Sequence, residues 1–238
     1  MRASIGTAFN APAFNQMRPT LYTVGSPGLR PEKIRSAELG IASNFRPDLI
    51  RLSASYFAQR FADLIQYVNG PPPSFKGSFA NLTAATSDGF EAELQLTPVT
   101  GWRTTASYTL VTPRVSELDP GHQGSDRVGD ALLRRPSHSG SVMVSYGRPS
   151  GLSVGTVVTY VGKRPDLDFA QFPSPRVTLP DYTKVDLSAE LPLPQLGPGG
   201  FALTARLDNV FDKRYEEVLN FAAPGRTVLI GGRASALF

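Results

Sequence analysis

Residues 201–211 read Phe-Ala-Leu-Thr-Ala-Arg-Leu-Asp-Asn-Val-Phe, with apolar and polar side chains in alternation. The polar set is Thr204, Arg206 and Asp208. The apolar set is Phe201, Leu203, Ala205, Leu207 and Phe211. Successive side chains of a β-strand point to opposite faces, so this period of two predicts a strand with one apolar and one polar face.

The same alternation recurs along the whole chain, and no segment of comparable length has the period of a helix. In residues 182–191, for example, Val185 and Leu187 alternate with Asp186 and Glu190. We therefore predict an all-β protein of about ten strands. The predicted strands are residues 2–9, 36–45, 49–60, 88–97, 102–112, 137–148, 152–162, 181–192, 201–212 and 226–238.

The predicted connections alternate between short and long. Those between paired strands at one end are short turns, whereas five long ones cover residues 10–35, 61–87, 113–136, 163–180 and 213–225. Outer-membrane barrels have this layout, with short periplasmic turns, long extracellular loops and strands of about 9–11 residues. The pattern favours a transmembrane antiparallel up-and-down β-barrel. A soluble β-sandwich, whose half-buried strands alternate in the same way, stays as the alternative.

Composition excludes several other classes of protein. Among the 238 residues there is no cysteine, which removes disulfide scaffolds and thiolate metal sites. A net charge of +4, dispersed along the chain, is too small for a nucleic-acid footprint, so no nucleic-acid partner is expected. No apolar run is long enough for a transmembrane helix. Residues 1–10 lack the apolar region of a signal peptide, so we expect a cytoplasmic protein or a start that is not the native one.

We predict no catalytic, cofactor or metal site. His122, Ser125 and Asp126 share a glycine-rich loop near His138, but a hydrolase needs such groups on a rigid frame. Two loop carboxylates, Asp166 and Asp168, are too few ligands for calcium. No residue in the sequence is identified as substrate-binding.

The final alternating strand ends at Phe238, the last residue. An aromatic residue at this place resembles the C-terminal assembly signal of bacterial outer-membrane barrels, which would make the barrel-assembly machinery a partner.

Five motifs in order along the chain resemble those of TonB-dependent outer-membrane receptors. Residues 207–216, Leu-Asp-Asn-Val-Phe-Asp-Lys-Arg-Tyr-Glu, resemble a segment near the receptor C-terminus. The other four are Phe9-Asn10-Ala11-Pro12, Leu29-Arg30-Pro31-Glu32-Lys33 with Glu38-Leu39-Gly40, Ser87 to Leu94, and Leu132 to Gly140 with Arg134-Arg135-Pro136. The layout is most similar to cobalamin and siderophore receptors. Asn10 and Val210 depart from the family pattern.

The resemblance implies a bacterial outer-membrane receptor for energy-coupled uptake of an iron-siderophore, haem or cobalamin. It implies a 22-stranded barrel around a plug, with outer-membrane lipid and an inner-membrane TonB-type complex as partners. Residues 1–238 match only the C-terminal part of such a barrel, so we expect a fragment without plug or signal peptide. The alternatives are a passive porin-like or structural barrel and, from another class, an outer-membrane hydrolase.

The residues themselves also suggest structural roles. Residues 209–213 are expected to end a strand in a turn, because Asn and Asp bond nearby backbone groups. Glu91, Glu93 and Glu190 are expected to face the lumen and pair with Arg103 or Arg206. Leu187, Leu203, Leu207 and Val185 are expected to face lipid, opposite lumen-facing Asp186, Glu190, Arg206 and Asp208. Aromatic residues near strand ends are expected to form interface girdles: Tyr56, Trp102, Tyr160 and Phe201.

Overall fold

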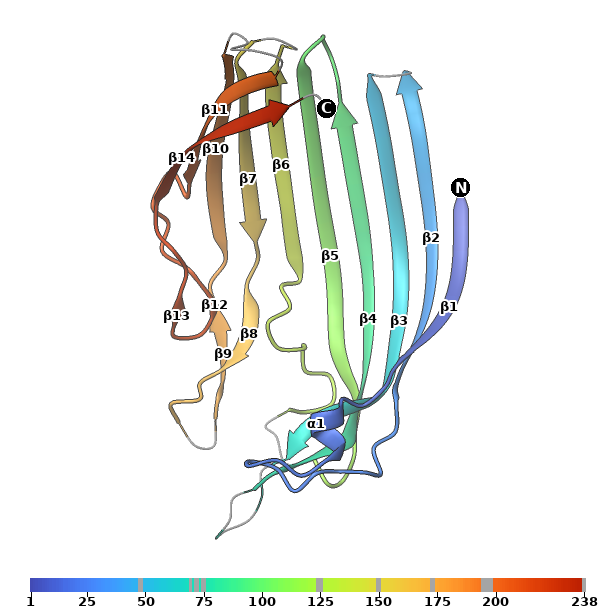
Figure 1. Ribbon diagram of the computed structural model, residues 1–238. Helices are drawn as coiled ribbons and strands as arrows, with labels where there is room; N and C mark the ends of the chain where they lie inside the picture. The colour runs from blue at the N-terminus through green and yellow to red at the C-terminus, as the bar shows by residue number, and fades with distance from the viewer. Residues whose placement is uncertain are drawn as a thin grey trace.

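The fold was analysed in a computed structural model (Figure 1). It describes residues 1–46, 49–68, 70, 73, 76–122, 126–148, 151–171, 174–193 and 199–236. Phe238, the predicted assembly signal, lies outside the described residues.

Ten strands form one antiparallel sheet in which neighbours along the sheet follow one another along the chain (Figure 1). Its order is β1-β2-β3-β4-β5-β6-β7-β10-β11-β14. This confirms the predicted all-β, up-and-down architecture. The strands are β1 (Arg2–Asn10), β2 (Glu32–Arg46), β3 (Ile50–Val68), β4 (Ser78–Leu96), β5 (Trp102–Leu118), β6 (His138–Gly147), β7 (Ser153–Val161), β10 (Tyr182–Leu193), β11 (Gly199–Asp208) and β14 (Thr227–Ala236).

The long connections all join the same ends of the strands, drawn at the bottom of Figure 1, and the short turns join the opposite ends. Within the long connections are the short helix α1 (Phe14–Met17) and two small hairpins. One hairpin pairs β8 (Arg164–Leu167) with β9 (Arg176–Leu179), and the other pairs β12 (Glu216–Val218) with β13 (Phe221–Ala222). We call the side of the sheet with the long connections the loop edge; it is formed by strand ends and is distinct from the unpaired edges of β1 and β14.

Several predicted boundaries are wrong at the loop edge. The expected loop over 61–87 is largely strand, because β3 continues to Val68 and β4 begins at Ser78. Likewise β2 begins at Glu32 and β5 continues to Leu118. The predicted strand over 201–212 instead ends at Asp208, where Asn209 and Asp212 adopt positive φ angles of 52° and 51°. The strand extensions escaped prediction because their two faces do not contrast in polarity.

Register places the alternating side chains on common faces across neighbouring strands. Leu187 lies opposite Leu207, and Leu191 lies opposite Leu203, so these leucines share one face of β10 and β11. Leu187 is 42% exposed and Leu203 45% exposed, which leaves a broad apolar surface uncovered. Charged residues occupy the opposite face, and an outer-membrane barrel wall needs this division between a lipid face and a lumen face.

The packed interior is small and lies toward the loop edge. Leu82, Ala85 and Val115 are buried where β4 and β5 extend beyond the apolar face, and Leu179 and Tyr182 are buried beside the β8–β9 hairpin. Elsewhere the sheet is one layer with exposed apolar side chains, such as Ile230 at 81%. Among the described residues, no helix is long and apolar enough to cross a bilayer.

The sheet does not close on itself within the described residues. Strand β1 pairs only with β2, and β14 pairs only with β11, so each presents one unpaired edge. An unpaired edge exposes a row of backbone N–H and C=O groups, and such a row is not tolerated against lipid.

The face assignment predicts unequal effects of arginine at two adjacent positions. Leu203→Arg should cost roughly 2–4 kcal/mol of folding free energy in a bilayer, because a lipid-facing arginine near the midplane loses its hydration. Thr204→Arg, on the opposite face beside Glu190, should cost much less. Urea unfolding of the complete barrel from lipid vesicles measures both, and equal destabilisation would contradict the assignment.

The arrangement of loops predicts which end of the protein meets the cell exterior. Protease added to intact cells should cut within residues 119–137 and 162–181, because these connections lie at the loop edge. The short turns at the opposite edge should be cut only after the outer membrane is permeabilised. Fragment masses identify the sites, and the reverse pattern would invert the topology.

Candidate functional site

The receptor-like motifs meet at the loop edge, where charged side chains connect neighbouring strands. In Leu29-Arg30-Pro31-Glu32-Lys33, the Arg30 Nη2 lies 2.6 Å from Asp63 Oδ1 and the Lys33 Nζ lies 3.7 Å from Asp63 Oδ2. Glu32 accepts a hydrogen bond from the Ile65 backbone N–H. The motif thus ties the start of β2 to an irregular segment of β3, where Asp63 has a φ of 59°.

Asn10, where the sequence departs from the receptor-like motif, adds a contact between β1 and the start of β2. Its Nδ2 donates to Glu32 Oε2 at 2.9 Å, so it bridges β1 and β2 without carrying a charge. Asn81 on β4 completes the arrangement, because its Nδ2 donates to the carbonyl oxygens of Arg30 and Asp63. Sequence reasoning missed Asp63 and assigned no structural role to Asn81, because their contacts depend on the register of β2, β3 and β4.

Two further motifs have local structural causes. Asn209 is buried, and its Oδ1 accepts from the Lys213 N–H at 2.8 Å while its Nδ2 donates to the Lys213 carbonyl. This confirms the expected turn after β11. In the motif from Ser87 to Leu94, a Cβ on Gly89 would lie 2.3 Å from Phe57 Cζ and 2.7 Å from the Leu110 carbonyl oxygen, so only glycine fits there.

Asp166 is the most buried charged group at the loop edge, with a side chain 0% exposed. One oxygen accepts from Arg134 Nε and from the Leu167 N–H, and the other accepts from the Leu219 N–H at 2.8 Å. The Arg134 N–H also donates to the Pro165 carbonyl. Asp166 therefore holds together the connection before β6, the β8–β9 hairpin and the segment beside β12. We call these contacts the Asp166 clamp.

Two opposing influences act on the Asp166 carboxyl. Burial raises its pKa, but the N–H groups of Leu219 and Leu167 and the Arg134 guanidinium favour the carboxylate and bring the pKa below its ordinary value. The group is thus ionised at neutral pH.

The Asp166 clamp borders an open cavity of about 710 Å³ between the two small hairpins. Its walls are mostly apolar, with Phe169, Val218, Leu219 and Phe221, and Arg134 contributes a cationic group. Arg164, which is buried, lies 5.4 Å from the Tyr182 ring centroid and donates to the Glu216 carbonyl. The hairpins are therefore held in place by buried polar contacts, with a cavity between them.

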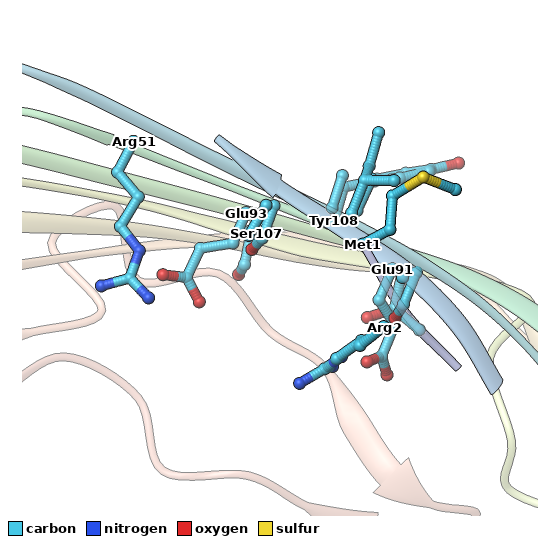
Figure 2. A pocket seen from close by; sticks show the side chains of 15 residues that line it. Met1, Arg2, Arg51, Glu91, Glu93, Ser107 and Tyr108 are labelled. Atoms are coloured by element: carbon cyan, nitrogen blue, oxygen red, sulfur yellow. The ribbon is translucent and has the colours of Figure 1, made fainter. Parts of the chain in front are cut away.

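The polar face of the sheet forms a second candidate surface. Figure 2 shows Arg51 and Glu93 pointing toward one another, with Glu91 and Arg2 close together on the same side and Tyr108 on the other. These side chains line a hollow of about 530 Å³ together with Ser53, Ser55 and Ser107. The hollow is hydrophilic and carries both positive and negative side chains. Such a surface can contact water or a folded polypeptide.

Ion pairs continue along this face, but two expected partners are wrong. Arg206 pairs with Asp208 at 2.5 Å, and Glu190 pairs with Arg233 on β14. Glu93 accepts from Gln95 Nε2 at 2.6 Å. Glu93 and Glu190 therefore contact neighbours on the same or the adjacent strand, and not Arg103 or Arg206 as the alternation of side chains suggested.

The loop groups considered for catalysis are separated. The Nε2 of His122 lies 3.9 Å from Asp126 Oδ2, but Asp126 is also paired with Arg176 at 2.5 Å. His138 instead bonds the Tyr108 hydroxyl at 2.7 Å, and Ser125 lies outside the described residues. Asp168 binds Ala170 N–H and Gln171, apart from the Asp166 clamp. Within the described ranges, no group of three or more histidine or acidic residues could hold a metal ion.

Comparison with known proteins identifies the family. The model of the "TonB dependent receptor-like, beta-barrel" family matches residues 1–210. The chain belongs to this family. Its members are outer-membrane transport receptors rather than enzymes, so this is a bacterial outer-membrane protein, as the motifs predicted.

Individual relatives share the fold at low sequence identity. The chain is 28% identical over 229 residues to the vitamin B12 transporter BtuB of Vibrio cholerae, covering 95% of this chain and 33% of the relative. Its structure matches the iron transporter FrpB of Neisseria meningitidis with a TM-score of 0.70 at 18% identity, over 97% of this chain and 36% of that one. The pyoverdine receptor FpvA of Pseudomonas aeruginosa, solved with pyoverdine bound, matches with a TM-score of 0.70 at 20% identity, over 99% and 33%. The chain thus spans about a third of the relatives' length.

Removal of the Asp166 carboxylate should loosen the β8–β9 and β12–β13 hairpins. Asp166→Asn keeps the size of the side chain but loses the charge that three donors share, which should cost about 1–3 kcal/mol. Limited proteolysis of the β8–β9 hairpin measures the loosening, with the exposed Asp181→Asn as matched control.

The same clamp should depend on pH in one direction. Because the folded-state pKa lies below the ordinary value of 3.8, the clamp's stabilisation is fully present above that pH and is lost as pH falls through the folded pKa. Hairpin protection that declined near pH 6, or declined equally in Asp166→Asn, would contradict this role.

Proposed function

We propose that this chain forms the C-terminal wall of a receptor barrel that takes up a large, scarce nutrient across the outer membrane. The observation that carries the proposal is the family match over residues 1–210, joined to a sheet whose long connections share one edge. A vitamin B12 transporter and a pyoverdine receptor among the relatives support a cobalamin or iron-siderophore as ligand class. Haem stays a third candidate.

The unpaired edges of β1 and β14 support a barrel larger than ten strands. Ten strands cut from a larger barrel have the wrong stagger to close without strain, because strand number, tilt and shear are linked. The free edges of β1 and β14 would then pair with further strands, toward the expected total of 22. The polar face with its hollow of about 530 Å³ would face a plug domain inside the lumen.

The remaining partners follow from that proposal. An inner-membrane TonB-type complex would supply energy through the plug. The barrel-assembly machinery would recognise the last strand through Phe238. The loop-edge cavity beside the Asp166 clamp is our candidate for contact with ligand before it enters the barrel. The passive porin-like or structural barrel is less favoured, because β1 and β14 are unpaired with each other within the described residues.

The fragment proposal predicts that residues 1–238 alone do not transport. The chain should be expressed behind a signal peptide in cells that lack the relevant receptor, and uptake of labelled cobalamin and ferric siderophore should be measured with and without an energised inner membrane. We expect no energy-dependent uptake, because plug and remaining strands are not supplied.

As a positive control, the chain should be co-expressed with the plug and the preceding strands of a homologous receptor. Partial recovery of uptake would support pairing of β1 with those strands. Energy-dependent uptake by the chain alone would overturn the fragment proposal. A stable monomer that conducts ions without energy would support the porin-like alternative.

A further inference from the structure

Three aromatic side chains line the cavity between the two small hairpins at the loop edge, which we call the aromatic cavity. Phe169 follows β8, Tyr215 precedes β12 and Phe221 begins β13, so three segments contribute one ring each. Phe169 is 69% exposed and Phe221 is 71% exposed. Because these rings lie in the connections and not in the strands of the sheet, lipid does not account for their exposure. A ligand in the cavity would cover them.

The aromatic cavity also carries a carboxylate whose charge is not balanced in its walls. Glu217 lines the cavity and accepts a hydrogen bond from the Tyr182 hydroxyl at 3.3 Å, which holds the carboxylate in place. Glu217 forms no ion pair with another described residue. The arginine in the walls, Arg134, is already paired with Asp166 at 2.8 Å. The cavity therefore presents aromatic rings and one uncompensated negative charge.

The ring stack beside the cavity already holds a cation from the chain itself. Tyr182 and Tyr215 stack with their ring centroids 4.0 Å apart, and the Arg164 Cζ lies 5.4 Å from the Tyr182 centroid. Arg164 donates to the backbone carbonyl groups of Pro180 and Glu216 and does not line the cavity. A cation within about 6 Å of an aromatic centroid is attracted by the electron-rich ring face. Tyr215 is thus the cavity-lining member of a stack that attracts positive charge.

We propose that the aromatic cavity binds the alkylammonium group of an organic cation. Its rings attract the ammonium charge, its apolar walls accept the alkyl substituents, and Glu217 supplies the counter-charge. An anionic group would face Glu217 and find Arg134 already paired. An uncharged apolar group would bury Glu217 without a partner, which is costly. The inference rests on the proposed uptake function, because it names the chemical group by which a nutrient would engage this chain before it enters the barrel.

The test compares choline, an alkylammonium probe, with neohexanol, which has the same shape without the charge. Each is titrated against the complete receptor that contains residues 1–238, purified in mild detergent, and saturation-transfer NMR measures binding. We expect choline to bind at least about tenfold more tightly, because cation–π attraction and the Glu217 charge act only on the cation. Benzoate, the anionic probe, should bind more weakly than choline. Equal affinity for choline and neohexanol would overturn the role of charge, and tighter binding of benzoate would overturn its sign.

Two matched pairs of variants assign this binding to the aromatic cavity. Glu217→Gln keeps the size of the side chain and removes its charge, so choline affinity should fall about tenfold while neohexanol affinity is unchanged. Its control is Glu117→Gln, which removes the same charge from an exposed position on β5 at the loop edge. Phe221→Leu keeps an apolar side chain without the ring and should weaken choline binding more than neohexanol binding. Its control, Phe14→Leu, replaces an exposed ring on α1 and should change neither.

The binding measurement stays informative whatever the variants do to folding or transport. Glu217 and Phe221 are exposed, so their replacement should leave the protease resistance of the β8–β9 hairpin unchanged. Undiminished choline binding in Glu217→Gln would contradict the proposal. If the unaltered receptor takes up cobalamin or ferric siderophore but does not bind choline, this inference alone fails. If it binds choline but takes up no nutrient, the proposed transport function alone fails.

Discussion

The structure depends on the backbone's need for hydrogen-bond partners where water is absent. In the ten-stranded sheet, each strand from β2 to β7 and both β10 and β11 pair on both sides, which is the only way a β-strand can lie in hydrocarbon. The pairing fixes the pleat, and the pleat sends alternate side chains to lipid and to lumen. The same requirement makes the free edges of β1 and β14 the strongest reason to regard the sheet as part of a larger wall.

At the loop edge water can satisfy backbone groups, so strand pairing is no longer required there. Side-chain hydrogen bonds and ion pairs fix the segments instead. Asp63 holds Arg30 and Lys33 at the start of β2, and Asp166 gathers donors from three different connections. Such clamps fix the ends of the strands while leaving the cavity between the hairpins open to variation. A family that recognises many ligands on one barrel benefits from this separation, because binding residues can change without disturbing strand pairing.

The two faces carry charge for different reasons. On the polar face, acidic and basic groups pair locally, as in Arg206 with Asp208, so the wall is hydrophilic without a strong net field. On the apolar face, Arg35 and Arg60 lie opposite one another, and neither forms an ion pair with another described residue. The locally paired charges of the polar face suit contact with water or a folded plug.

The sequence by itself determined the ten strands, their up-and-down order and their face assignment, because a bilayer imposes strict alternation on every residue that crosses it. It also determined the family, through motifs such as Arg30 to Lys33 and Asn209 to Lys213. Only the tertiary structure decided how far β3 and β4 extend beyond the membrane, since alternation is not required there. It also decided the β8–β9 and β12–β13 hairpins, the Asp166 clamp and the facing of Arg35 and Arg60, because each depends on register between segments that are distant or too short to show a period.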